Sequence, residues 1–429
     1  MLLVTDSRDL AEALSEVLAA PGTVLLDSAR ADADSGADGA LLFAAPVRTV
    51  EAHALEDVGP ALDALDRALA DGHHVAGVMA YEAGAALVDG LGPTRLDSDV
   101  PLVWFGVYDA PWRVPADTLG AVFAPLAEAA GDAPVSDLTF GLSRSAYAER
   151  IAVAKAHIRA GDVYQVNLTA PLRFRTSATP VELYAALRAR QAVPYGAFLT
   201  LGGAGETAVL SVSPELFVRV DPAVGGGRTV TARPMKGTAP RGATLDDDDR
   251  LAAALVAGEK DRAENLMIVD LLRNDLARVA LRGSVRVPRL FEAERYATLT
   301  QMTSTVTADL LPGAGLGDVL RATFPCGSVT GAPKRRAVEV LRAVEDGPRG
   351  AYCGAVGYAA PGAGGGAGGS LGRAVFSVAI RTAVLAGGVG RYGIGSGVVW
   401  DSEADAEYDE CLLKASVLAG LSAAPVRVA

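Results

Sequence analysis

Strand-like segments follow one another in neighbouring pairs along this chain, with helical segments between the pairs, and this order constrains the fold most. Short apolar or alternating runs predict strands at Thr23–Ser28, Ala40–Phe43, Val75–Tyr81, Leu102–Tyr108, Val163–Leu168, Gly196–Leu201, Ala208–Val212, Leu216–Val220, Ala374–Val384 and Val398–Trp400. Strands that are neighbours in sequence can pair as antiparallel hairpins, whereas a doubly wound fold places a helix after each strand. We therefore expect an α+β fold with mostly antiparallel sheets.

Helical spacing of apolar residues predicts the segments between those strands. The predicted helices are Asp9–Ala19, Val58–Ala70, Ser145–Ala160, Val181–Arg190, Asp246–Val279, Gly315–Ala322, Lys334–Val344 and Asp405–Gly420. We interpret Ser145 as an N-cap and Asp246–Val279 as largely one long helix. The glycine-rich stretch 359–372 predicts the tip of a hairpin.

A small, acidic stretch at 127–137, which contains proline and glycine, predicts a linker. It divides the chain into an N-terminal region, residues 1–130, and a second unit, residues 138–425. The 429 residues suffice for a large core in one or two domains.

Charge and cysteine content limit the compartment and the partners. The formal net charge is -12 without a local basic patch, so we expect no binding to nucleic acid. The three cysteines lack metal-site spacing and suit a reducing compartment. The chain has no run of about 20 apolar residues and begins without the basic residues of a signal peptide, so we expect a cytoplasmic protein with no membrane span.

Two pairs of acidic residues are spaced so that each pair shares one face of a helix. Asp261 and Glu264 are three residues apart, and so are Glu407 and Glu410, with Lys414 continuing the second stripe. If the two faces meet, they form an oxygen-rich cleft suited to Mg²⁺. The alternative is two ordinary solvated helix faces, with Glu410 and Lys414 as a surface pair.

Lys236 lies on a short, stiff loop, between Pro234 and Gly237, after a strand-like run. Its alternative reading is a surface lysine in a turn. Arg381 ends an apolar run and needs an anionic partner, either a bound carboxylate or a buried structural ion pair. The turns at Ser328 and at Gly395-Ser396-Gly397 could offer backbone N–H groups to an anion.

Three other patterns are rejected as sites. The run Gly388–Gly393 fits G-x-G-x-x-G but leads into a strand rather than a helix, so it does not predict a dinucleotide site. The segment Gly327–Lys334 resembles a phosphate loop only loosely, because its lysine does not follow a glycine. The adjacent pair His73-His74 cannot face one metal ion as residues at i and i+4 would.

Several of these stretches together resemble the chorismate-utilising enzymes, namely the anthranilate, aminodeoxychorismate, isochorismate and salicylate synthases. The resemblance runs from about Ser145 to Gly420. It is carried by Gly161–Leu168, Ser213-Pro214-Glu215, Pro234–Thr238, Lys260–Leu276, Phe324–Lys334, Gly350–Gly354, Ile380-Arg381-Thr382 and Asp401-Ser402-Glu403, and more weakly by Leu25–Ser28, Tyr81–Gly84 and Trp104–Tyr108. It implies a layered α/β/β/α core in which two mostly antiparallel sheets pack face to face, with an N-terminal region that shares the sheets.

Two positions indicate which of these synthases the chain resembles most. The lysine of Pro-x-Lys-Gly-Thr, Lys236, resembles that of aminodeoxychorismate synthase component I, and Gln165 stands where isochorismate and salicylate synthases carry a water-activating lysine. The resemblance therefore implies amination of chorismate at C4. The chain also reads Gln301–Ser304 where many members have His-Leu-Val-Ser, and that histidine is associated with pyruvate elimination in anthranilate synthases.

The resemblance also assigns roles to individual residues. Lys236 would attack C2 of chorismate, which requires a neutral amine, and Glu215 would protonate the departing C4 hydroxyl. Mg²⁺ would be held by Glu264 and Glu410, with support from Asp261 and Glu407. The substrate-binding residues would be Gln165, Gly237, Thr238, Ser328, Tyr352, Arg381, Gly395, Gly397 and Lys414.

The resemblance implies a partner, because the four histidines all precede the C-terminal half and no spare domain could hold a glutaminase triad. A separate glutamine amidotransferase subunit would supply ammonia, and the product would feed folate or antibiotic synthesis. The rivals are anthranilate synthase component I and a non-catalytic regulatory protein that binds an amino acid such as tryptophan near Leu25–Ser28.

Overall fold

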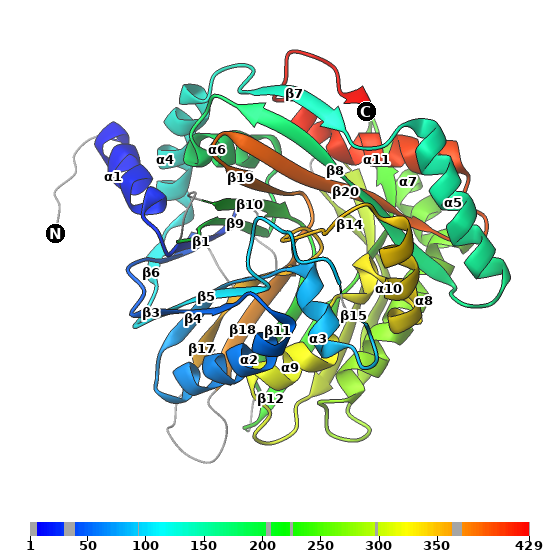
Figure 1. Cartoon of the computed structure of the whole chain (residues 1–429), viewed down its shortest axis with the longest axis horizontal. Coiled ribbons are helices and arrows are strands. Elements are labelled where there is room, and N and C mark those ends of the chain that lie inside the picture. Colours follow the sequence, from blue (N-terminus) through cyan, green and yellow to red (C-terminus); the bar gives the residue numbers. More distant parts are fainter. Residues whose placement is uncertain are drawn as a thin grey trace.

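A computed structural model describes residues 7–29, 39–92, 94–202, 207–223, 226–296, 299–362 and 371–428. Its two large sheets lie between layers of helices (Figure 1). This architecture is the α+β fold that the sequence predicts. None of the helices formed by the described residues is long and apolar enough to cross a membrane.

The first sheet has 11 strands and joins segments from both ends of the chain. Its order is β21 (Arg427–Val428), β7 (Val135–Phe140), β8 (Gln165–Thr176), β20 (Val389–Val398), β19 (Thr382–Ala386), β10 (Ala208–Ser213), β9 (Tyr195–Thr200), β1 (Thr23–Ser28), β2 (Gly39–Phe43) and β6 (Trp112–Val114), with β16 (Gly331–Ala332) beside β8. Among these described strands, only β7 and β21 pair in parallel.

The second sheet has 10 strands, and its described pairs are antiparallel. Its order is β13 (Met235–Pro240), β15 (Leu299–Asp309), β12 (Arg228–Arg233), β11 (Leu216–Pro222), β18 (Leu371–Val378), β17 (Ala355–Pro361), β4 (His74–Met79), β5 (Val103–Tyr108) and β3 (Arg48–Ala52), with β14 (Arg286–Arg295) beside β15. Strands from the N-terminal region therefore extend both sheets.

The sheets pack face to face because their central strands are apolar on both sides. Along β5, Phe105 faces a core that the second sheet shares with helices, whereas Trp104 and Tyr108 face a core between the sheets. From the first sheet, Leu199 and Val209 enter the same inter-sheet core. Successive side chains of a strand point to opposite faces, so a continuous apolar run fills two cores at once.

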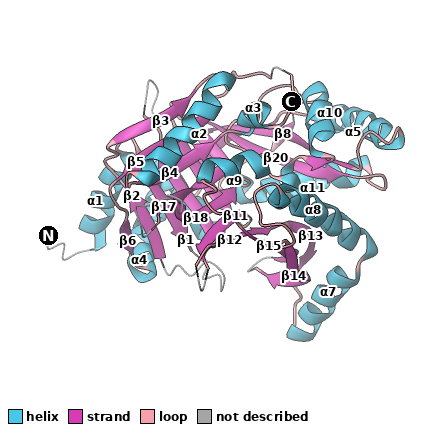
Figure 2. Ribbon diagram, turned by 90° about the horizontal axis from the view of Figure 1, so that it is seen from below, coloured by secondary structure: helices cyan, strands magenta, loops and turns pink. Residues whose placement is uncertain are grey.

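Helices cover the outer faces of both sheets (Figures 1 and 2). On the first sheet lie α1 (Ser7–Ala19), α4 (Ala116–Ala129), α5 (Arg144–Arg159), α6 (Pro180–Arg190), α10 (Lys334–Val344) and α11 (Ala404–Ala419). On the second lie α2 (Leu55–Ala70), α8 (Glu259–Ala277) and α9 (Leu316–Thr323), while α7 (Leu245–Ala257) lies beside β13 and β14. Short helical turns are η1 (Tyr81–Ala83), α3 (Gly84–Leu87) and η2 (Gly327–Val329).

Several predicted elements differ in detail. The predicted long helix is two helices, because Gly258 adopts φ -59° and ψ 119° and ends α7 before α8 begins. The N-cap of α5 is Ser143 rather than Ser145, since its hydroxyl accepts the N–H of Ala146 at 3.2 Å. The predicted linker is shorter than 127–137, because α4 continues to Ala129 and β7 begins at Val135, which is buried.

The fourth difference concerns Arg381. The predicted strand Ala374–Val384 is two strands, β18 and β19, and they belong to different sheets. Arg381 stands between them with φ 51°, a left-handed conformation that no strand adopts. The glycine-rich stretch joins β17 and β18, which pair as a hairpin as predicted, although residues 363–370 of its tip lie outside the described residues.

Candidate active site

Lys236 lies on strand β13 rather than on the predicted loop, and a β-bulge there redirects its side chain. Between Met235 and Thr238 the pairing of β13 with β15 shifts register, and Gly237 adopts φ 85° there. A bulge with glycine in the left-handed region turns a side chain away from the regular pleat. Gly237 also lies against α8, where a Cβ on it would be 3.1 Å from a carboxylate oxygen of Asp261.

The lysine reaches from the second sheet to the first. A Cβ placed on Gly397 of β20 would lie 3.2 Å from Lys236 Nζ and 2.6 Å from Gln165 Nε2. The absence of a side chain at Gly397 therefore leaves room where the two side chains meet. Gln165 is buried, and neither end of its amide has a hydrogen-bond partner among the described residues. Buried polar groups are normally paired, so an orphaned amide here fits a ligand.

Glu215 precedes β11 and is 3 % exposed. Burial raises its pKa to about 7, against the opposing effects of a Ser328 side-chain hydrogen bond, the Lys236 charge and the N–H of Met235. Its backbone N–H donates to Ser213 Oγ at 3.2 Å. Glu215 Oε1 has no partner within the described part of the chain, and a carboxyl that is partly protonated near neutrality can serve as a general acid.

Arg381, between β18 and β19, is close enough to Glu215 for the charge of that carboxyl to affect its pKa. Burial lowers its pKa, while Tyr392, Tyr296 and Glu215 act in the opposite direction. Its guanidinium forms no ion pair with any described carboxylate. The sequence left two possible partners for Arg381, a structural ion pair or a bound carboxylate. The described residues contain no such ion pair, and a bound carboxylate would satisfy the guanidinium.

The two acidic helix faces and Lys236 are close enough for their charges to affect one another. Burial raises the pKa values of Asp261 and Glu264; Lys236 opposes the shift of Glu264, while Glu407 adds to it. The charge of Glu410 likewise raises the pKa of Asp261. These mutual effects place carboxylates of α8 and α11 within electrostatic range of one another.

Lys414 ties α11 to β20. Its Nζ lies 2.6 Å from Glu410 Oε1 and donates to the carbonyl oxygen of Gly395 at 2.8 Å. Burial would raise the pKa of Glu410, but the Lys414 charge and hydrogen bond outweigh it and lower the pKa. Lys414 therefore shares its positive charge between a carboxylate and the glycine strand that borders Lys236.

The acidic faces suit a hard cation by donor type. Glu407 is buried, its Oε1 accepts from Ser402 Oγ at 2.7 Å, and its Oε2 has no partner among the described residues. In the described ranges no three acidic, histidine or cysteine groups stand close enough to enclose an ion by themselves. Mg²⁺ commonly takes only one or two carboxylates and completes its shell with water and substrate oxygens, so the residues present fit it.

The other predicted binding residues lie at the edges of this region. Ser328, on η2, touches the site through its side-chain hydrogen bond to Glu215. Thr238 is exposed on β13. Tyr352 is buried with its ring against Gly393 of β20, where a Cβ would meet ring atoms at 2.1 Å. Tyr352 itself lies between α10 and β17, and the glycine it contacts is four residues along β20 from Gly397.

Sequence reasoning missed two neighbours of the site. Tyr392, on β20, has a buried hydroxyl without a partner in the described part, and it affects the pKa of Arg381. The charge of Lys260 acts on Asp261, Glu264 and Glu410. Sequence signals for both were present. Lys260 is the first residue of the motif Lys260–Leu276, and Tyr392 lies in the run Gly388–Gly393, which was rejected as a dinucleotide site and belongs to the β19–β20 hairpin.

Two further residues of interest are satisfied internally. Lys334, from the rejected phosphate-loop pattern, binds Asp275 at 2.7 Å. In the Leu25–Ser28 segment, Asp27 accepts hydrogen bonds from Arg188 and Tyr184. Tryptophan binding at that segment stays a prediction.

The fold and the site belong to one class: the chain is a member of the chorismate binding enzyme family, whose pattern matches residues 23–420. Its relatives include an aminodeoxychorismate synthase of Streptomyces griseus, 44% identical over 305 residues, which are 70% of this chain and 40% of the relative. An anthranilate synthase component 1 of Streptomyces coelicolor is 41% identical over 68% of this chain and 55% of its own length.

The chain thus spans about half the length of these curated relatives or less. Among solved structures, anthranilate synthase component I from Streptococcus pneumoniae superimposes with a TM-score of 0.71 at 25% identity, covering 90% of this chain and 93% of that one. The face-to-face layers that the resemblance implied are therefore confirmed.

Proposed function

We propose that the protein is an aminodeoxychorismate synthase component I, which aminates chorismate at C4. The observation that carries this proposal is the convergence of Lys236 on Gln165 and Gly397, within electrostatic range of Glu215. A lysine, rather than a small residue, at the point where the sheets meet provides an amine where a ring could lie. Gln165, an amide, cannot activate water as a lysine would.

The residues act in two displacements. Lys236 Nζ forms a bond to C2, both ring double bonds shift, and the C4–O bond breaks as Glu215 gives its proton to the departing hydroxyl, which leaves as water. Ammonia then bonds to C4, the double bonds shift back, and the C2–N bond breaks to release Lys236. The excess proton of the entering ammonia restores the proton lost by Glu215.

The remaining residues hold the substrate. Arg381 has no carboxylate partner among the residues that the structure describes, and it would bind one carboxylate of chorismate. Glu264 and Glu410, supported by Asp261 and Glu407, would hold Mg²⁺, which neutralises charge on a substrate carboxylate when bound. Ser328 keeps Glu215 in place through its side-chain hydrogen bond.

Ammonia would come from a glutamine amidotransferase partner. The name of the Streptomyces coelicolor relative, component 1, implies a second component for that enzyme. In this chain the histidines are at 53, 73, 74 and 157, and none of them lies in the C-terminal half. A glutaminase triad, which needs histidine, would then be supplied by another subunit.

Anthranilate synthase is the competing function, because relatives of both kinds are about equally similar. Against it stands Gln301, where a histidine associated with pyruvate elimination occurs in many members. Incubation with chorismate, Mg²⁺ and ammonia separates the two functions. We expect a product that yields 4-aminobenzoate only after a lyase is added, and anthranilate fluorescence without the lyase would contradict the proposal.

Substitution of Lys236 tests the nucleophile. Lys236→Ala and Lys236→Arg should both abolish C4 amination, although arginine keeps the positive charge near Glu215 and Glu264. With ammonia withheld, the unsubstituted protein should gain the mass of chorismate less one water on Lys236, measured by intact-protein and peptide mass spectrometry. Full activity of Lys236→Arg would show that only the charge matters.

A further inference from the structure

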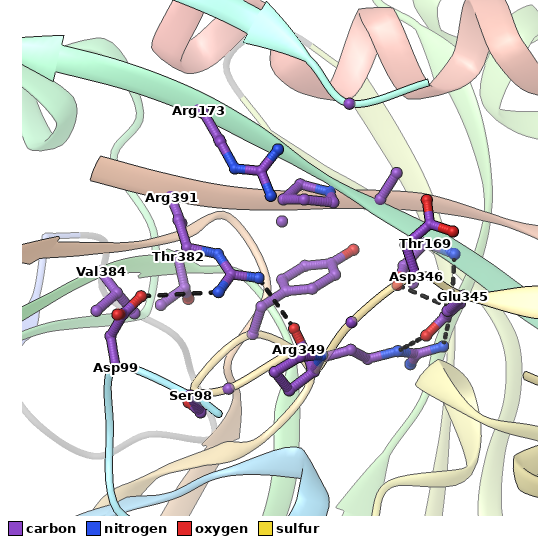
Figure 3. Close-up of a pocket in the computed structure, with 18 of the residues that line it drawn as sticks. Ser98, Asp99, Thr169, Arg173, Glu345, Asp346, Arg349, Thr382, Val384 and Arg391 are labelled. Atoms are coloured by element: carbon purple, nitrogen blue, oxygen red, sulfur yellow. Dashed lines mark hydrogen bonds and ion pairs between the residues drawn. The ribbon is translucent and has the colours of Figure 1, made fainter. Parts of the chain in front are cut away.

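A polar pocket lies along β8 and β20, the strands that carry Gln165 and Gly397, and reaches toward their other end. It measures about 120 Å³ and is lined by residues of β8 and β20 and by the loops before β5 and after α10 (Figure 3). Alternate residues of β20 face one way, so Arg391 and Gly393 share a face with Gly397. At about 3.4 Å per residue, Arg391 lies about 20 Å along the strand from Gly397.

Two arginines stand directly opposite one another in this pocket. Arg173 of β8 and Arg391 of β20 are Cα partners in the antiparallel ladder. Like charges directly opposite on neighbouring strands destabilise a sheet. Figure 3 shows both side chains reaching over the same space. This arrangement is unfavourable unless an anion lies between or beside the two guanidinium groups.

Two of the three acidic residues of the pocket are already paired with other arginines. Glu345 pairs with Arg349 at 2.7 Å, and Asp346 pairs with Arg150 at 2.5 Å.

Arg391 is only weakly compensated, since its Nη1 lies 3.7 Å from Asp99 and its Nη2 donates to the carbonyl oxygen of Pro348 at 3.1 Å. Arg173 is exposed and has no ion pair or hydrogen bond with any described residue. With four arginines and three acidic residues among the lining side chains, one positive charge is left over, and it belongs to Arg173.

The remaining lining includes Ser98, Thr169 and Thr382, but one part of the wall is apolar. The ring of Tyr352 packs on Gly393, and Pro171, Pro348 and Val384 complete the apolar part of the wall. A guanidinium pair recognises a carboxylate through charge-assisted hydrogen bonds, and an apolar wall takes a ring or a short hydrocarbon body. The two parts together select a ligand that carries one carboxylate on a flat apolar body.

We propose that this pocket is a binding site for a small carboxylate with a flat apolar body, held by Arg173 and Arg391 and separate from the group of residues around Lys236. The carboxylate would lie between the two guanidinium groups and cancel the repulsion across the strands. The body would lie against Tyr352.

Benzoate tests the site, with benzamide as its uncharged isostere and inorganic phosphate as a second anion. Calorimetric titrations use the Arg381→Ala variant, which removes the unpaired cation of the cleft. Benzoate should bind with one-to-one stoichiometry, benzamide should not bind, and phosphate should compete poorly. Adding Arg173→Gln or Arg391→Gln should weaken benzoate binding at least about tenfold, because each removes a charge-assisted contact.

The matched control is Arg175→Gln, an exposed arginine on the same face of β8 that lines no part of the pocket. It changes the net charge equally and should leave benzoate binding unchanged. Arg173→Gln breaks no ion pair, so its thermal unfolding should not move to lower temperature. Absence of benzoate binding, equal binding of benzamide, tighter binding of phosphate, or equal loss in Arg175→Gln would each overturn the proposal.

Discussion

Replacing Glu215 with glutamine tests the acid role and its electrostatic cause together. Burial raises the pKa of Glu215 from 4.5 to about 7, and Ser328, Lys236, the N–H of Met235 and Lys414 reduce the shift without cancelling it. Between these two values the folded protein holds a proton that the unfolded chain releases. Glutamine keeps the size of the side chain but cannot titrate.

The size of the change in unfolding free energy follows from the difference between the folded and unfolded pKa values of Glu215. Because the folded pKa lies above the unfolded one, the stability from this proton is complete below pH 4.5 and is lost as the pH rises through 7. At about 1.36 kcal/mol per pH unit, the loss is about 3 kcal/mol, of which about 2.5 kcal/mol falls between roughly pH 5 and pH 8. Relative to Glu215→Gln, the unsubstituted protein should lose about that much over this interval.

Urea unfolding of both proteins at the two pH values measures the difference, since other titrating groups cancel in the comparison. Activity supplies a second readout. The amination rate should fall as the pH rises past 7, and below pH 7 Glu215→Gln should lower it by about 10² to 10⁴. A pH-independent stability difference would refute the raised pKa, and a variant with an unchanged rate would refute the acid role.

Three further perturbations separate the parts of the site. Gly397→Ala places a methyl group 2.6 Å from Gln165 Nε2 and 3.2 Å from Lys236 Nζ, so kcat/KM should fall by up to about 100-fold. Its thermal stability should change little, because the ends of those side chains can move. Arg381→Ala should lower kcat/KM for chorismate by about 10- to 100-fold without loss of stability, whereas a structural ion pair would be lost in both readouts. EDTA should abolish turnover and added Mg²⁺ should restore it, and activity that persists in EDTA would remove the metal from the mechanism.

Hydrophobic periodicity predicted most helices and strands, because the pattern of apolar residues along a segment reflects which of its faces are buried. The prediction was wrong where contacts with distant parts of the chain decide the local structure. Nothing local shows that Ala374–Val384 leaves one sheet and enters the other, since both halves are apolar and both are buried. A glycine at position 258 could have indicated the break between α7 and α8, but the helical spacing of apolar residues on both sides of it favoured one continuous helix.

The sequence by itself determined the chemical groups available, namely a lysine between a proline and a glycine, two pairs of acidic residues with helical spacing, and the glutamate of Ser213-Pro214-Glu215. It also showed their family resemblance. Only the tertiary structure decided that Lys236 meets Gln165 and Gly397 from the opposite sheet. The raised pKa of Glu215 and the missing carboxylate partner of Arg381 also arise there. The physical reason is that desolvation and charge pairing depend on every group packed around a side chain, and those groups come from strands far apart in the chain.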